Sequence, residues 1–231
     1  MTDGYTRSPL LIKGAFVELG EPFLGPVPNV IVFQYNPETL TRTLAPWTPP
    51  SSEGDQSASE NTMAAPYDPK ESFTLTLEVD ATDALEKGDP VALLTGVADR
   101  IAALEMLTKP VSSEVLGEAL GSLFGAVDTV PRAEVPVVLF IWGPGLILPV
   151  RLTSFSVEEQ AFSPTLYPIR AKISVGLQVL TPDEIVKQGT EDSLAKDLAV
   201  ASWKFTMGQR EVLARLNLAN SVESIIGMLP L

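Results

Sequence analysis

A strict alternation of apolar and polar residues over positions 169–179, in the segment IRAKISVGLQV, constrains the fold more than any other feature of the chain. Successive side chains of a strand point to opposite faces of the sheet, so this pattern predicts a strand with one buried and one solvated face. The solvated face carries Arg170 and Lys172. Residues 73–79 alternate in the same way. Two such strands are typical of an antiparallel sheet or of a barrel wall.

Further apolar segments, bounded by proline and glycine turns, read as additional strands. The second of them runs straight into Asn36-Pro37, a pair that begins turns in many proteins, so a local corner and an interface corner are both open. Two late segments are separated by the turn GPG and predict a hairpin. The expected strands span residues 10–20, 29–35, 73–79, 135–143, 146–162 and 169–179, and residues 39–43 form a polar strand-like segment.

One helix is expected beside the sheet. Asp89 followed by Pro90 is a typical helix start, because aspartate caps free backbone N–H groups and proline fits the first turn. Apolar residues then recur near helical spacing over 91–107, and Pro110 ends the segment. We interpret this helix as a structural cover for an open side of the sheet, with a partner-binding role as the alternative.

Two segments and the end of the chain depart from this pattern. Residues 46–71 are rich in proline, serine and glutamate and predict a long exposed loop. Residues 111–134 hold an apolar-rich piece with three glycines, which we interpret as a weak helix in an insertion. The pattern becomes helical after Pro182, so we expect a sheet domain at 1–181 and a helical extension at 182–231.

The 231 residues include no cysteine and no histidine. Disulfides, thiolate metal sites, the usual general base near neutral pH and the Ser-His-Asp arrangement are therefore excluded. With 16 Lys+Arg against 29 Asp+Glu the net charge is −13, and no basic cluster stands out, so nucleic-acid binding is not expected. The sequence starts without a signal-peptide pattern, and proline and glycine interrupt the longest apolar run, so we expect no membrane insertion.

Carboxylate pairs for acid–base work are also scarce. Glu158 and Glu159 are neighbours on an expected strand, so their side chains point to opposite faces. Asp80 with Asp83 is the other candidate pair, and Glu86 lies near them without the spacing of a calcium loop. We therefore expect a protein that is not an enzyme and that holds neither a cofactor nor a metal.

The order of the expected elements is strand, strand, long loop, strand, helix, insertion, three strands and helical tail. A run of antiparallel strands with one packed helix predicts a mainly β, α+β fold in which the helix covers the open side of a barrel or curled sandwich.

Four segments follow one another along the chain: Phe33 with Asn36-Pro37-Glu38, the strand 73–79, Trp142-Gly143, and PIRA at 168–171. In this order they resemble the tube-protein family of contractile injection systems. More narrowly, the chain is similar to the baseplate tube-adaptor member that often carries a LysM domain. The resemblance covers roughly residues 10–180. Each segment alone is a weak signal, and the match gains its specificity because all four occur in this order. The tail lacks the usual Gly-Asp-Thr-Leu opening of a LysM domain, so a degenerate LysM-like domain and an unrelated helical tail fit equally well.

The resemblance implies a phage-tail-tube-like β-barrel with a flanking helix, copies of which close into a hexameric ring around a lumen. It implies contacts with other copies of the chain, an inner tube protein, a spike or hub protein, and other baseplate and sheath components. Assembly is expected in the bacterial cytoplasm as part of a phage tail-like particle, with release from the cell as one outcome. The expected interface residues are Tyr35, Asn36, Pro37, Glu38, Trp47, Tyr67, Trp142, Tyr167, Arg170 and Lys172.

Several alternatives stay open at this point. Trp142 fits core packing as well as a contact between subunits. Arg170 and Lys172 fit cross-strand pairing with Glu78 and its neighbours, a lumen lining, or a contact with the next subunit. The whole chain also fits an inner tube subunit, although a helical tail argues against a unit that stacks on copies of itself. A module that binds a glycan or a small apolar ligand is the third reading.

Overall fold

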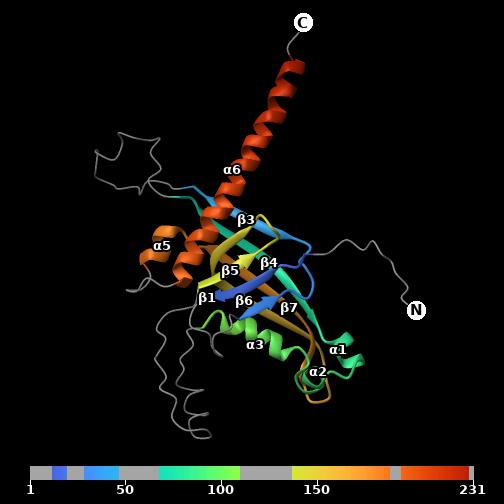
Figure 1. Ribbon diagram of the computed structural model, residues 1–231. Helices are drawn as coiled ribbons and strands as arrows, with labels where there is room; N and C mark the ends of the chain where they lie inside the picture. Colours follow the sequence, from blue (N-terminus) through green and yellow to red (C-terminus); the bar gives the residue numbers. More distant parts are fainter. Residues whose placement is uncertain (1–11, 20–28, 47–67, 110–136, 188–193, 229–231) are drawn as a thin grey trace, which may run out of the picture.

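The protein is built around one antiparallel sheet of seven strands (Figure 1). The computed structural model describes residues 12–19, 29–46, 68–109, 137–187 and 194–228, with the backbone alone at 219–228. The strands are β1 (Ala15–Leu19), β2 (Val30–Val32), β3 (Leu40–Ala45), β4 (Lys70–Asp80), β5 (Val137–Ile141), β6 (Ile147–Phe162) and β7 (Pro168–Val179). The helices are α1 (Thr82–Glu86), α2 (Pro90–Thr95), α3 (Ala98–Met106), α5 (Pro182–Lys187) and α6 (Leu194–Met228).

The sheet order is β2-β1-β5-β6-β7-β4-β3, and every pair is antiparallel. The two alternating strands predicted from the sequence, β4 and β7, are neighbours that pair from Ser72↔Gln178 to Asp80↔Arg170. Their burial alternates residue by residue, as the pattern predicts. The predicted hairpin is also present, because β5 pairs with β6 across a turn in which the Trp142 N–H donates to the Leu146 carbonyl. The mainly β, α+β class is thus confirmed.

The sheet curls around an apolar core that contains four phenylalanines, and the ring of one of them, Phe140, contacts the rings of the other three. The Phe140 ring lies 5.7 Å from the rings of both Phe16 and Phe73, and Phe33 meets Phe16 edge-on at 5.0 Å. Edge-to-face and tilted contacts of this kind are favoured by the aromatic quadrupole. Because these rings come from strands at opposite ends of the sheet order, they hold the curl together.

The expectation of a closed barrel is wrong for the described residues. β3 pairs with β4 only as far as Leu40↔Leu75, so the β4 edge from Thr76 onward has no strand beside it there. β2 has three residues and pairs with β1 alone among the described strands. No ladder therefore joins the two margins of the sheet. α3 covers this seam, burying Ile101 and Leu104 against the core, in agreement with its interpretation as a structural cover.

The single helix predicted over 91–107 is two helices, α2 and α3, with a break at Gly96. The predicted start is correct, because the Asp89 side chain accepts hydrogen bonds from the N–H groups of Val91 at 2.9 Å and Ala92 at 3.0 Å. Gly96 has a φ of +58°, and a Cβ there would lie 2.1 Å from the Pro168 carbonyl oxygen. The Val97 N–H donates to that same carbonyl at 2.8 Å, so a contact with β7 replaces a turn of helix.

The extension after residue 181 is helical, as predicted. α6 spans 35 residues and its first half packs on the sheet, where Ala199 and Thr206 are fully buried (Figure 1). Whether the extension is LysM-like stays a prediction. The calls for an exposed loop at 46–71 and for an insertion at 111–134 fall largely outside the described residues, as do Trp47 and Tyr67.

Candidate assembly surfaces

Asn36 forms the corner that follows β2. Its Oδ1 accepts a hydrogen bond from the Gly14 N–H at 2.9 Å, and its Nδ2 donates to the Ile12 carbonyl at 2.9 Å. The carboxamide therefore takes the place of a strand residue beside the chain that enters β1. Gly14 is required by packing there, because a Cβ would lie 2.7 Å from the Phe33 ring. Asn36 is thus held by the local fold, while Tyr35 and Glu38 beside it are exposed.

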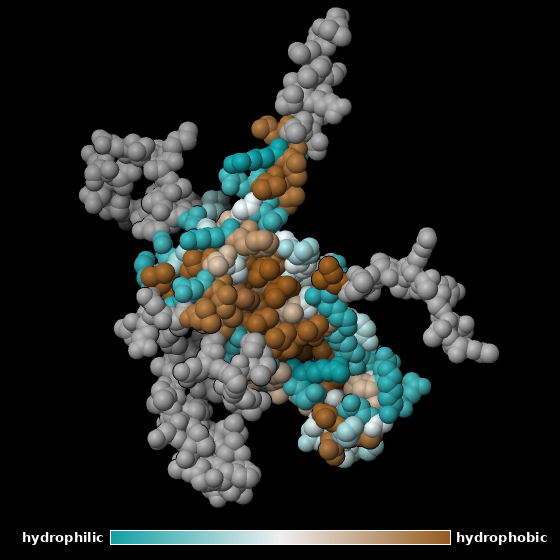
Figure 2. All heavy atoms as spheres, viewed as in Figure 1, coloured by the Kyte–Doolittle hydropathy of each residue, from teal (hydrophilic) through white to brown (hydrophobic). Residues whose placement is uncertain are grey.

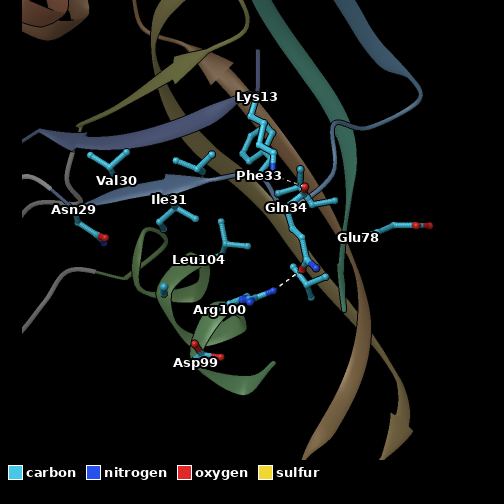
Figure 3. Close-up of a pocket in the computed structure, with 14 residues that line it drawn as sticks. Lys13, Asn29, Val30, Ile31, Phe33, Gln34, Glu78, Asp99, Arg100 and Leu104 are labelled. Carbon is cyan, nitrogen blue, oxygen red and sulfur yellow. Dashed lines mark hydrogen bonds between the residues drawn. The ribbon is translucent and has the colours of Figure 1, made fainter. Parts of the chain in front are cut away.

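Gln34 bridges the seam between the two margins of the sheet. Its Nε2 donates to the Asp80 carbonyl at 2.8 Å, and its Oε1 accepts from the Asp80 N–H at 3.0 Å. Arg100 of α3 donates to the same Oε1, as Figure 3 shows. One glutamine side chain thus satisfies both backbone groups of the last β4 residue, on the edge that β3 leaves uncovered.

A cleft of about 460 Å³ lies along this seam, between β2, the end of β4, and α3 (Figure 3). Its walls include Ile31, Leu77 and Leu104, with Glu78 and Asp99 among the charged residues that line it. Gln34 and Arg100 also line it, but their polar groups are used in the bridge to Asp80. The polar groups of these two residues are therefore used within the fold.

Asp80 ties the end of β4 to β7 and α1. Its carboxylate accepts hydrogen bonds from the Thr82 hydroxyl and N–H, and pairs with the Arg170 guanidinium at 2.7 Å. The Thr82 hydroxyl bond is the main cause that lowers the pKa of Asp80 below 3.8, with Arg170 adding to it and burial opposing it. Asp80 is therefore used structurally, and Asp83 and Glu86 do not join it in a cluster that would bind a metal.

The outer face of β4, β7 and β6 is polar and solvated. Lys172 pairs with Glu78 across the strands at 3.2 Å, and Arg170 pairs with Asp80, so the cross-strand reading of these two cations is confirmed. Next to these charged rows the face carries small residues. A Cβ on Gly176 would lie 2.3 Å from the Ser154 Oγ, which explains the glycine. The small residues, in register, are Thr74, Gly176 and Ser154, then Thr76, Ser174 and Ser156.

α6 is fixed across the end of the sheet where β4 and β6 begin. Glu71, 5% exposed, accepts a two-pronged salt bridge from Arg210 at 2.7 Å and a bond from Arg42 at 2.6 Å. The Thr206 hydroxyl accepts from the Ile147 N–H at 3.0 Å and donates to the Ile147 carbonyl at 2.7 Å. Sequence reasoning missed this anchor. The available signal was the alternation along β4, which places Glu71 on the same buried face as Phe73.

The predicted interface residues that the structure describes do not gather at one place. Trp142 is half-buried and stacks on Phe140 at 6.1 Å, so core packing accounts for it. Tyr167 lies exposed in the turn between β6 and β7, and Pro37 follows Asn36 at the corner. The structure describes one chain, so a role for any of them in contacts between subunits stays a prediction.

The fold and these surfaces agree with one comparison. A family model described as contractile injection system tube protein matches residues 21–187, which include β2 to β7 and the helices that cover the seam. The chain belongs to the contractile injection system tube protein family. A search of curated proteins found no match.

Membership makes the chain a structural, tube-like component of a contractile injection system that assembles with itself and with other components of the particle. The family is not an enzyme family, and Glu158 and Glu159 follow each other along β6. Within the described residues no helix is both long and apolar enough to cross a bilayer. The features that bear on this assembly are the surfaces of the protein.

Proposed function

We propose that this chain is a ring-forming baseplate subunit that connects or initiates the inner tube on the spike or hub. The observation that carries the proposal is α6, which begins after the family match ends at residue 187 and runs to Met228. A subunit of a repeating tube offers both ends of its sheet to copies of itself. Here a helix is anchored across one end, which suits a single specialised ring.

Open strand edges supply the means of assembly. β2 and β3 are the margins of the described sheet, and such edges pair readily with strands of another chain. Pairing between neighbouring copies would continue the sheet around a ring, and a closed hexamer would leave no edge exposed. The outer face of small residues around Gly176 would then line the lumen, with Arg170 and Lys172 neutralised by Asp80 and Glu78.

The proposed partners are the inner tube protein, the spike or hub protein, and neighbouring baseplate and sheath components. The particle would be assembled in the bacterial cytoplasm. The chain would act by assembly alone, without catalysis, nucleic acid or insertion into a membrane.

The copy number of the chain in purified particles tests this role. A ring at the tube–hub junction predicts about six copies per particle, far fewer than the tube protein of the same particle. Quantitative mass spectrometry gives the ratio, and electron cryomicroscopy gives the position. A count equal to that of a repeating tube would replace the proposal with the inner tube subunit, and absence of the chain from particles would contradict both.

A further inference from the structure

The two ends of β6 carry different structures. At Ile147, where the strand begins, the Thr206 hydroxyl of α6 binds both the backbone N–H and the carbonyl. At Phe162 the strand ends in the turn that leads to β7. β6 is 16 residues long, so α6 and this turn lie at opposite ends of the sheet (Figure 1). A ring whose subunits all stand in one orientation, as cyclic symmetry requires, therefore has two different ends.

The end at the β6–β7 turn is built from residues that match the tube protein family. The match covers residues 21–187, which include α1, α2 and the turn. α6 begins at Leu194, beyond the match, and lies across the other end, where Arg210 binds Glu71. A ring of tube protein that stacks on this chain therefore meets a tube-like surface free of α6 at the β6–β7 end.

Exposed apolar side chains gather at this end, on α2 and on the β6–β7 turn. The two segments are adjacent, because the Val97 N–H, just after α2, donates to the Pro168 carbonyl at 2.8 Å. Figure 2 shows apolar atoms among polar ones here, at the lower right of the body. Each of these side chains is at least 44% exposed. We name this surface the tip patch, and it consists of Val91, Leu93, Leu94, Phe162, Leu166 and Tyr167.

Leu166 is the most exposed member of the tip patch, at 79%, and its φ is +65°. The left-handed region is unfavourable for leucine, and glycine or asparagine would fit it with less strain. The turn is nevertheless fixed, because the Leu166 N–H donates to the Ser163 carbonyl at 2.9 Å and the Ser163 N–H to the Tyr167 carbonyl at 2.8 Å. A strained backbone thus holds an apolar side chain in solvent, which is the arrangement expected of a contact residue.

Acidic side chains border the tip patch. The Asp89 N–H donates to the Ala84 carbonyl at 2.9 Å, which holds α1 against the start of α2. The border consists of Asp83, Glu86 and Asp89, all exposed, against Lys87. Arg170, at the start of β7, is neutralised by its pair with Asp80 at 2.7 Å. A matching partner surface is therefore apolar with basic residues around it.

We propose that the tip patch is where the first ring of the inner tube protein docks, through an apolar surface with basic residues around it. The assignment rests on the proposed function, and it gives the ring a polarity, because α6 then faces the spike or hub. A second copy of this chain fits less well. Its α6 covers one of the ends that it would offer, and tip against tip would bring two acidic borders together.

Photocrosslinking within assembled particles tests this polarity. Tyr167→p-benzoylphenylalanine places a photoreactive ring in the tip patch with little change of shape. Phe205→p-benzoylphenylalanine is the matched control, because Phe205 is also aromatic and is 43% exposed on α6, against 44% for Tyr167. Each variant is expressed with the other components of its particle and irradiated after purification. Mass spectrometry then identifies the protein that each position has captured.

The crosslinks from position 167 are expected to contain peptides of the tube protein, and those from position 205 are not. Tube peptides at position 205, spike or hub peptides at position 167, or no tube peptides at position 167 would overturn the polarity and leave the proposed ring intact. Crosslinks from both positions to further copies of this chain would contradict the proposed function as well, since only a repeating subunit meets itself at both ends.

Loss of the apolar contact is the second test. Leu166→Asn with Leu94→Gln removes the two most exposed leucines of the tip patch, and asparagine suits the left-handed backbone, so the variant is expected to melt no lower than the wild type. Val186→Gln is the control, because Val186 is 66% exposed on α5, away from the tip patch.

Electron microscopy counts the baseplates that carry a tube. The tip variant is expected to lower the fraction with a tube at least about tenfold, because the lost contact is repeated in every copy of the ring. The control is expected to leave the fraction unchanged. A tip variant whose baseplates carry tubes as often as the wild type, or an equal fall in the control, would overturn the proposal.

Discussion

Gln34 replaces a missing strand at Asp80, donating to its carbonyl at 2.8 Å and accepting from its N–H at 3.0 Å. The β-ladder stops before this point, and the side chain reproduces for one residue the two hydrogen bonds that a neighbouring strand would make. Together with Asn36, which pairs with the chain before β1, it makes the segment after β2 a tie between the margins of the curled sheet. The Asn36-Pro37 corner therefore has a structural role within its own chain.

Replacing Gln34 with alanine is expected to destabilise the protein by about 1–3 kcal/mol, because the Asp80 N–H loses its partner and the Asp80 carbonyl and Arg100 keep only their 3.5 Å bond to each other. Urea unfolding followed by circular dichroism measures the change. Gln209→Ala, at an exposed position on α6, is the control and is expected to change stability by less than about 0.5 kcal/mol. Equal effects of the two substitutions would show that the bridge does not stabilise the seam.

Gly96→Ala is expected to be much more harmful than Gly88→Ala. Both glycines have positive φ, so both substitutions strain the backbone, and the strain is greater at Gly96 because its ψ of −116° lies outside the left-handed helical region. A Cβ on Gly88 meets nothing within 4 Å, whereas a Cβ on Gly96 would lie 2.1 Å from the Pro168 carbonyl oxygen. Gly96→Ala must therefore also push α2 away from β7. Thermal unfolding compares the two variants, and similar melting temperatures would contradict the close approach.

The sequence predicts those parts of the fold whose cause is local. Apolar and polar residues alternate along β4 and β7 because one face of each strand is buried. The start of α2 at Asp89-Pro90 depends on two adjacent residues. The break at Gly96 is caused by the carbonyl of Pro168, which is distant in sequence. The helical spacing of apolar residues therefore continues past Gly96 and does not predict the break. The open seam depends on where the β3 register ends, at Leu75, which no spacing in the sequence specifies.

The surfaces were harder to predict than the strands. Arg170 and Lys172 could be placed on a solvated face from their parity alone, and their partners Asp80 and Glu78 follow from the antiparallel register. The exposed apolar residues of α6, such as Leu198 and Leu216, recur at helical spacing, but the same pattern would also suit a buried helix. Only the packing of Ala199 and Thr206 shows which side of α6 is turned away from the protein.

Glu71→Gln is expected to destabilise the protein by about 1.5–3 kcal/mol, because it leaves the partly exposed Arg42 and Arg210 beside each other without the buried carboxylate that pairs with both. Glu211→Gln, which removes an exposed pair with Arg215, is the control and should cost at most about 0.5 kcal/mol. Denaturant unfolding compares the two. A mild effect of Glu71→Gln would mean that Trp203 and Met207 hold α6 on the sheet without this ion pair.

Asp80 predicts how stability falls in acid. Its folded pKa lies below 3.8, chiefly because the Thr82 hydroxyl donates to the carboxylate, with Arg170 adding to the effect. A carboxyl with a depressed folded pKa stabilises the protein above its unfolded pKa, and this contribution is lost as pH falls through the folded pKa. Asp80→Asn is therefore expected to lower the free energy of unfolding at neutral pH, with the difference from wild type shrinking below about pH 4. Thr82→Val should raise the pKa of Asp80 and so make the free energy of unfolding depend less steeply on pH in acid. Unfolding curves at a series of pH values test both, and a gap between wild type and Asp80→Asn that stays constant down to acid pH would refute the assignment.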